Sequence, residues 1–141
     1  MPEKCKEWWL LTILLTILLR KRIQRVSFDY TSIADVVFKK LSENGKKVYL
    51  FGASQLEIDA FAGKIKAVYP NLIVVGYSNG YVKRESWVEV ISEILELNAD
   101  FTLVGLGAGL QEEFLEQLKD SGYSGVGYSC GGFIRQESNS K

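Results

Sequence analysis

The chain has 141 residues, of which 47% are hydrophobic and 24% charged, and its formal net charge is zero, so we expect one domain with a buried core and no nucleic-acid partner. It contains no histidine, which excludes histidine-based triads and zinc sites and removes the commonest general acid or base. Its two cysteines, Cys5 and Cys130, fit no metal-ligand spacing, so we expect reduced thiols, no metal site and a cytoplasmic protein.

The first predicted element is an apolar helix with basic flanks over residues 7–24. The run Trp8–Leu19 is interrupted only by Thr12 and Thr16, and it is shorter than the ~20 apolar residues that span a bilayer. Residues 1–25 hold six basic and two acidic side chains. Because apolar side chains surround this helix, two interpretations stand: a helix buried in the core, or one lying shallowly in an anionic membrane surface.

Helices with apolar stripes follow. Thr31 or Ser32 can cap the first of them, which ends at Asn44-Gly45. The next three are expected over residues 55–69, where Pro70 ends the helix, 85–97 and 111–119. The side chains expected to face inward are Ile33, Val37 and Leu41 in the first, Phe61, Ile65 and Val68 in the second, and Trp87, Ile91, Ile94 and Leu95 in the third.

Short apolar strands alternate with these helices, a pattern typical of parallel βαβ units. The predicted strands are Val48–Phe51, Leu72–Val75, Phe101–Val104 and Gly125–Tyr128. We therefore expect an α/β fold: a Rossmann-like parallel sheet of about four strands with helices on both faces, preceded by the apolar helix. One domain over residues 1–141 is expected, with βα repeats over 25–135 and a frayed polar tail over 136–141.

Every predicted strand runs into a turn that contains glycine, and ligands of such sheets bind outside the carboxyl ends of the strands. Glycine lets backbone N–H groups approach an anion, so a nucleotide diphosphate is the natural ligand. However, the G-x-G-x-x-G pattern is not met, no Walker lysine follows a turn, and tight turns need glycine without any ligand. The candidate binding residues are Gly52, Ser54, Gly76, Ser78, Asn79, Gly105, Gly107, Gln111, Gly131 and Gly132.

Taken together, the sequences of these turns indicate a protein family more specifically than any single turn does. The segments "VYLFGASQLEIDAFAGKIKAVYPNLIVVGYSNGY" and "ADFTLVGLGAGLQEEFL" resemble the WecG/TagA/CpsF family of bacterial glycosyltransferases. Upstream "RIQRVSFDY" is similar to the family's Arg-Val segment, and downstream "GVGYSCGGFI" to its glycine-rich strand. The resemblance covers about Arg25–Ile134.

The resemblance implies transfer of a sugar from a UDP-sugar to a lipid-linked diphosphate acceptor at the inner face of the membrane, without a required cofactor or metal. Such enzymes build teichoic acid linkage units, enterobacterial common antigen or capsule. By position, Gln111 falls on the glutamine of the family's Gln-Glu motif and Arg25 on its Arg-Val arginine. The implied roles are a neutral donor for Gln111 and a charge clamp for Arg25, which could instead be a surface arginine in a basic cluster.

The chain also departs from the family pattern. The family's catalytic aspartate, in an Asp-Gly turn, would fall near Glu7, where no Asp-Gly exists, so Glu7 is only a weak candidate base. An acidic residue of the glycine-rich region falls on Arg135, which reverses the charge. Much of the family's upstream half and its basic C-terminal appendage are expected to be missing.

Three functional interpretations therefore remain. The first is a glycosyltransferase whose base is not identified. The second is a catalytically incomplete remnant, or a nucleotide-sugar-binding or interaction subunit, that contacts the membrane peripherally through Trp8–Arg22. The third is an unrelated α/β binding module. An incomplete sheet and an exposed apolar helix would both favour a homo-oligomer.

Overall fold

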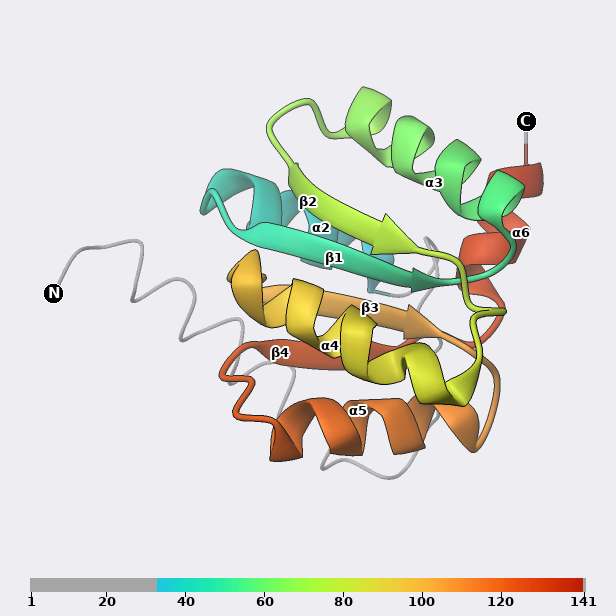
Figure 1. Cartoon of the computed structure of the whole chain (residues 1–141). Helices are drawn as coiled ribbons and strands as arrows, with labels where there is room; N and C mark the ends of the chain where they lie inside the picture. Colours follow the sequence, from blue (N-terminus) through green and yellow to red (C-terminus); the bar gives the residue numbers. More distant parts are fainter. Residues whose placement is uncertain (1–32, 141) are drawn as a thin grey trace, which may run out of the picture.

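The computed structural model describes residues 33–140, and the predicted helix over residues 7–24 lies outside this part. Strands and helices alternate along the chain (Figure 1). None of the helices between residues 33 and 140 combines the length and hydropathy needed to cross a bilayer. The elements are α2 (Ala34–Glu43), β1 (Lys47–Gly52), α3 (Gln55–Val68), β2 (Ile73–Ser78), the 3₁₀ turn η1 (Arg84–Ser86), α4 (Trp87–Glu96), β3 (Phe101–Gly105), α5 (Leu110–Asp120), β4 (Val126–Ser129) and α6 (Phe133–Asn139).

The four strands form one sheet in the order β2-β1-β3-β4, and every neighbouring pair is parallel. Leu50 of β1 is in register with Leu103 of β3, which is in register with Tyr128 of β4. After β2 the chain crosses over to the other side of β1 to begin β3. The strand order therefore reverses between β1 and β3, and ligands of such sheets bind beside this switch point.

Helices cover both faces of the sheet, as the sequence predicted (Figure 1). On one face α2, α3 and α6 enclose a core in which the Phe61 and Phe133 rings meet edge to face at 5.6 Å. On the other face α4 and α5 enclose a second core, where Trp87 meets Phe114 at 5.5 Å. Of the inward stripes predicted for α2 and α4, Val37, Leu41, Trp87, Ile91 and Ile94 are buried, as predicted. The other two predicted residues, Ile33 and Leu95, are half-buried and pack against the edges of the two cores.

Several predicted boundaries were wrong. The N-cap of α2 is Ile33, whose side chain makes no capping hydrogen bond, and the predicted caps, Thr31 and Ser32, lie outside the described residues. Val68 is 55% exposed, because α3 ends there and Tyr69 enters the core in its place. The expected tail is helical as far as Asn139, since α6 packs on α3.

Candidate functional site

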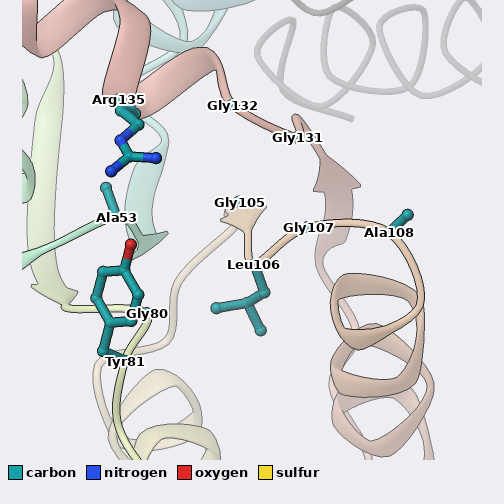
Figure 2. A pocket seen from close by; sticks show the side chains of 10 residues that line it. All are labelled: Ala53, Gly80, Tyr81, Gly105, Leu106, Gly107, Ala108, Gly131, Gly132 and Arg135. Atoms are coloured by element: carbon teal, nitrogen blue, oxygen red, sulfur yellow. The ribbon is translucent and has the colours of Figure 1, made fainter.

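A pocket of about 440 Å³ opens at the carboxyl edge of the sheet (Figure 2). Residues from the turns after all four strands contribute to its wall, so it lies at the switch point between β1 and β3. This is the edge at which the sequence predicted a ligand. The lining residues are Ala53, Gly80, Tyr81, Gly105, Leu106, Gly107, Ala108, Gly131, Gly132 and Arg135.

Glycine is needed here because the turns after all four strands approach one another at backbone distance. A Cβ atom on Gly52 would lie 2.5 Å from the carbonyl oxygen of Gly105, and one on Gly105 would lie 2.8 Å from the carbonyl oxygen of Gly131. A Cβ on Gly80 would lie 2.9 Å from the Cα of Gly52. Contacts this short leave no room for a side chain, so these glycines set the shape of the pocket floor.

Some backbone donors in the wall are unused. Within residues 33–140, the N–H groups of Gly107, Ala108 and Gly132 have no hydrogen-bond acceptor. Their neighbours differ: the Gly109 N–H donates to Glu112 Oε2 at 2.6 Å, and the Gly131 N–H donates to a side chain at 3.1 Å. Free N–H groups clustered in turns form concavities that bind anions, so this wall suits a phosphate group.

Two longer side chains extend into the same space. Figure 2 shows the guanidinium of Arg135, from α6, and the ring of Tyr81, from the loop after β2, extending toward one another at one side of the pocket. Arg135 is the charged member of the lining, and its Nε lies 3.5 Å from Glu57 Oε1. A guanidinium beside unused N–H groups gives the pocket a positive character.

Four of the predicted binding residues, Gly105, Gly107, Gly131 and Gly132, line the pocket. Gly52 lies beneath them in the backbone contact described above. The remaining predicted residues, Ser54, Gly76, Ser78, Asn79 and Gln111, contact other parts of the protein.

Two of these residues shape the turns around the pocket. Ser54 is the N-cap of α3, and its Oγ accepts the Glu57 N–H at 3.2 Å. Asn79 accepts the Tyr81 N–H at 3.1 Å and donates to Gln55 Oε1 at 3.2 Å. Asn79 therefore fixes the turn that carries Tyr81 rather than lining the pocket itself.

Gly76 and Ser78 surround the buried ring of Tyr49. A Cβ on Gly76 would lie 2.9 Å from that ring, and Ser78 Oγ lies 2.6 Å from the Tyr49 hydroxyl. The hydroxyl also donates to Glu93 Oε2 at 2.6 Å. Burial, followed by the contact with Glu93, raises the pKa of the Tyr49 phenol well above its usual range. Gly76 and Ser78 thus make room for Tyr49 and bind its hydroxyl, respectively, where β1, β2 and α4 meet.

Gln111 connects two walls of the pocket. Its side chain is buried, Oε1 accepts the Gly131 N–H at 3.1 Å, and Nε2 donates to Glu112 Oε1 at 3.3 Å. The amide therefore joins the start of α5 to the turn after β4. Gln111 does not line the pocket, and in this arrangement it holds the Gly131 turn in place.

Arg25 and Glu7 lie outside the described residues. Sequence reasoning missed Arg135 and Tyr81 as pocket residues, although each follows a glycine turn, Gly131-Gly132 and Asn79-Gly80 respectively. A basic or aromatic residue close behind such a turn is the signal that could have identified them. Among residues 33–140 there is no group of histidine, cysteine or acidic side chains that could hold a metal ion.

Cys130 lies beside the pocket floor, where burial of the thiol raises its pKa to about 12. We expect the native Cys5→Ser variant, in which Cys130 is the remaining cysteine, to react with Ellman's reagent at pH 8 about 100-fold or more slowly than the denatured variant, because only the thiolate attacks. Stopped-flow absorbance measures both rates. Native and denatured rates within tenfold of each other would contradict a buried, protonated thiol.

Comparison with known proteins adds a family and several relatives. The model of the Glycosyl transferase WecG/TagA/CpsF family matches residues 9–141. The chain is 32% identical, over 82% of its length, to a UDP-Gal:alpha-D-GlcNAc-diphosphoundecaprenol beta-1,4-galactosyltransferase of Shigella boydii. It is 33% identical, over 68% of its length, to an N-acetylglucosaminyldiphosphoundecaprenol N-acetyl-beta-D-mannosaminyltransferase of Bacillus subtilis. A Bacillus spizizenii protein with the same name is 30% identical over 73% of the chain.

These matches span 48% of the Shigella protein and 38% of each Bacillus protein. The chain therefore corresponds to about half, or less, of each of these relatives. All three relatives carry names of transferases that act on a diphosphoundecaprenol-linked sugar.

Proposed function

The chain belongs to the WecG/TagA/CpsF family of glycosyltransferases, and from this membership we propose that its pocket binds a UDP-sugar as the donor of a glycosyl transfer. The observation that carries the proposal is the pocket at the sheet's switch point, where unused N–H groups and a guanidinium converge. The donor's diphosphate would lie against the N–H groups of Gly107, Ala108 and Gly132. Tyr81 offers a ring face on which the uracil or the sugar can stack.

In the proposed reaction, a hydroxyl of a lipid-linked diphosphate sugar attacks the anomeric carbon of the donor. The bond between that carbon and the diphosphate breaks, and UDP leaves with an added negative charge. The proton of the attacking hydroxyl passes to a general base or to water. The N–H groups and Arg135 would stabilise this charge as it develops, and the pocket would hold the donor for attack. Because the acceptor is anchored to a lipid, we place the reaction at the inner face of the membrane.

A second candidate is a nucleotide-sugar-binding or interaction subunit that does not itself transfer the sugar. The residues that line the pocket favour this candidate. They are one cation, one phenol and otherwise glycine and apolar residues, and such groups bind a ligand rather than catalyse a transfer. Calorimetric titration with UDP combined with a transfer assay separates the candidates. UDP binding with turnover on diphosphoundecaprenol-linked GlcNAc supports the transferase, binding without turnover supports the subunit, and the absence of UDP binding rejects both.

Gln111→Ala is expected to weaken UDP binding about fivefold, because the Gly131 N–H loses its acceptor and a buried hydrogen bond contributes about 1 kcal/mol. The substitution weakens UDP binding indirectly, because it displaces the turn that contains Gly131. Gln117→Ala is the matched control, since Gln117 is an exposed glutamine of the same helix. Calorimetry on both variants tests this, and an unchanged UDP affinity in Gln111→Ala would remove Gln111 from the site.

A further inference from the structure

The guanidinium of Arg135 is held from one side only. Its Nε lies 3.5 Å from Glu57 Oε1, whereas its two terminal nitrogens have no acceptor within residues 33–140. Figure 2 shows the guanidinium turned toward the space between Ala53 and the Gly131-Gly132 turn. The edge formed by the two terminal nitrogens can donate two parallel hydrogen bonds to a phosphate.

The carboxylate that contacts Arg135 is itself fixed. Glu57 lies in the first turn of α3, where its N–H is bound to the Ser54 cap at 3.2 Å. Its Oε2 is buried and has no hydrogen-bond partner within the described residues, so Oε1 is the oxygen presented to the guanidinium. A carboxylate with one oxygen enclosed by protein has little freedom to follow a moving arginine.

The two helices that carry this pair are also joined. Phe133 is buried against Phe61, and Lys64 Nζ donates to the Glu137 carbonyl oxygen at 2.9 Å and lies 3.7 Å from Glu137 Oε2. The backbone of Arg135 is therefore set relative to α3. With the backbone fixed, the contact with Glu57 needs to restrict only the side-chain torsions of Arg135.

We infer that Glu57 is a positioning residue: its Oε1, paired with the Arg135 Nε at 3.5 Å, turns the two terminal nitrogens into the pocket, where they bind the diphosphate of the nucleotide-sugar donor. The inference rests on the proposed function, because it takes the donor to be a nucleoside diphosphate sugar. Because the Arg135 side chain is 64% exposed, the Coulomb energy of the pair is small, and the effect of Glu57 comes from orienting the arginine.

The test is the dissociation constant of UDP, measured by calorimetry on the full chain and a set of variants. Arg135→Gln should weaken UDP binding about tenfold or more, since charged hydrogen bonds to the diphosphate are lost. Glu57→Ala should weaken it about three- to tenfold, because the arginine loses its orientation. Glu57→Gln should stay within about twofold of the original affinity, since the amide carbonyl still presents an acceptor oxygen to the Arg135 Nε.

Glu137→Gln is the matched control. It removes the other ion pair between α3 and α6 but keeps the Lys64 hydrogen bond to the Glu137 carbonyl oxygen and the packing of Phe133 on Phe61. Because these contacts still hold α6, and Glu137 does not line the pocket, UDP affinity should be unchanged. Thermal unfolding midpoints of all variants show whether each is folded, and the Glu57→Gln result keeps the test decisive if Glu57→Ala unfolds.

The outcomes distinguish a failure of the proposed UDP-sugar binding from a failure of the positioning role of Glu57. Wild-type protein that binds no UDP overturns the proposed function and this inference with it. Wild-type binding with Glu57→Ala as tight as wild type, or with Glu57→Gln as weak as Arg135→Gln, overturns the inference alone. Weak binding by Glu57→Ala together with near-normal binding by Glu57→Gln supports it.

Discussion

Gly52→Ala is expected to destabilise the protein by about 3 kcal/mol or more and to abolish UDP binding, because overpacking against backbone atoms cannot be relieved by a change of rotamer. The added methyl group would lie 2.5 Å from the Gly105 carbonyl oxygen, so the ends of β1 and β3 would have to separate. Since these two ends flank the switch point, the pocket wall moves with them. Urea denaturation measures the loss of stability, and calorimetry measures the loss of binding.

Gly63→Ala is the control for this substitution. Gly63 lies within α3, and a Cβ there would meet no atom within 4 Å, so alanine should stabilise the protein by about 0.5–1 kcal/mol through helix propensity. The two substitutions add the same methyl group and are expected to have opposite signs. Equal effects would contradict the backbone contact at Gly52.

Phe61→Ala is expected to lower the free energy of unfolding by about 3–5 kcal/mol, the usual cost of emptying a buried aromatic site. Phe61 is fully buried, and its ring meets those of Phe38 at 6.5 Å and Phe133 at 5.6 Å. The contact with Phe133 anchors α6, which carries Arg135. We therefore expect weaker UDP binding even in conditions where the variant remains folded.

Leu56→Ala provides the comparison for Phe61→Ala. Leu56 lies in the same helix but is 83% exposed, so its loss should change stability by less than about 0.5 kcal/mol. Urea denaturation of both variants decides the point. Comparable losses for the two substitutions would mean that α3 does not face the core as described.

Much of the fold could be predicted because its elements have regular patterns. The spacing of Ile91 and Ile94 identified the inward face of α4, and the apolar run Phe101–Val104 identified a buried strand. The prediction failed at the ends of elements, where local rules compete with packing. Val68 fits the helical stripe of α3, but at the last turn Tyr69 takes the interior position.

The candidate site could be predicted less completely. Glycine turns at the ends of the strands placed the site at the correct edge, since only the parallel topology is needed for that step. Which glycine faces the ligand depends on register, and the sequence does not show that Gly76 instead makes room for the Tyr49 ring. The pairing of Glu57 with Arg135 joins residues far apart in the chain and depends on α6 packing against α3.

The site combines closely packed backbone turns with two longer side chains. The closely packed turns at Gly52, Gly105 and Gly131 fix the backbone donors, and Gln111 ties one of these turns to α5. Arg135 and Tyr81 are exposed side chains beside these turns. A fixed donor wall beside two exposed side chains suits a substrate that must enter, be held by its diphosphate and leave as UDP.

The most direct test of the central claim is a titration of ¹⁵N-labelled protein with UDP, followed by amide chemical shifts. The account predicts saturable shifts concentrated at Gly107, Ala108 and Gly132, together with the side-chain Nε–H of Arg135. Shifts absent at millimolar UDP, or confined to the opposite edge of the sheet around Asn98 and Gly125, would contradict a nucleotide-sugar site at the switch point between β1 and β3.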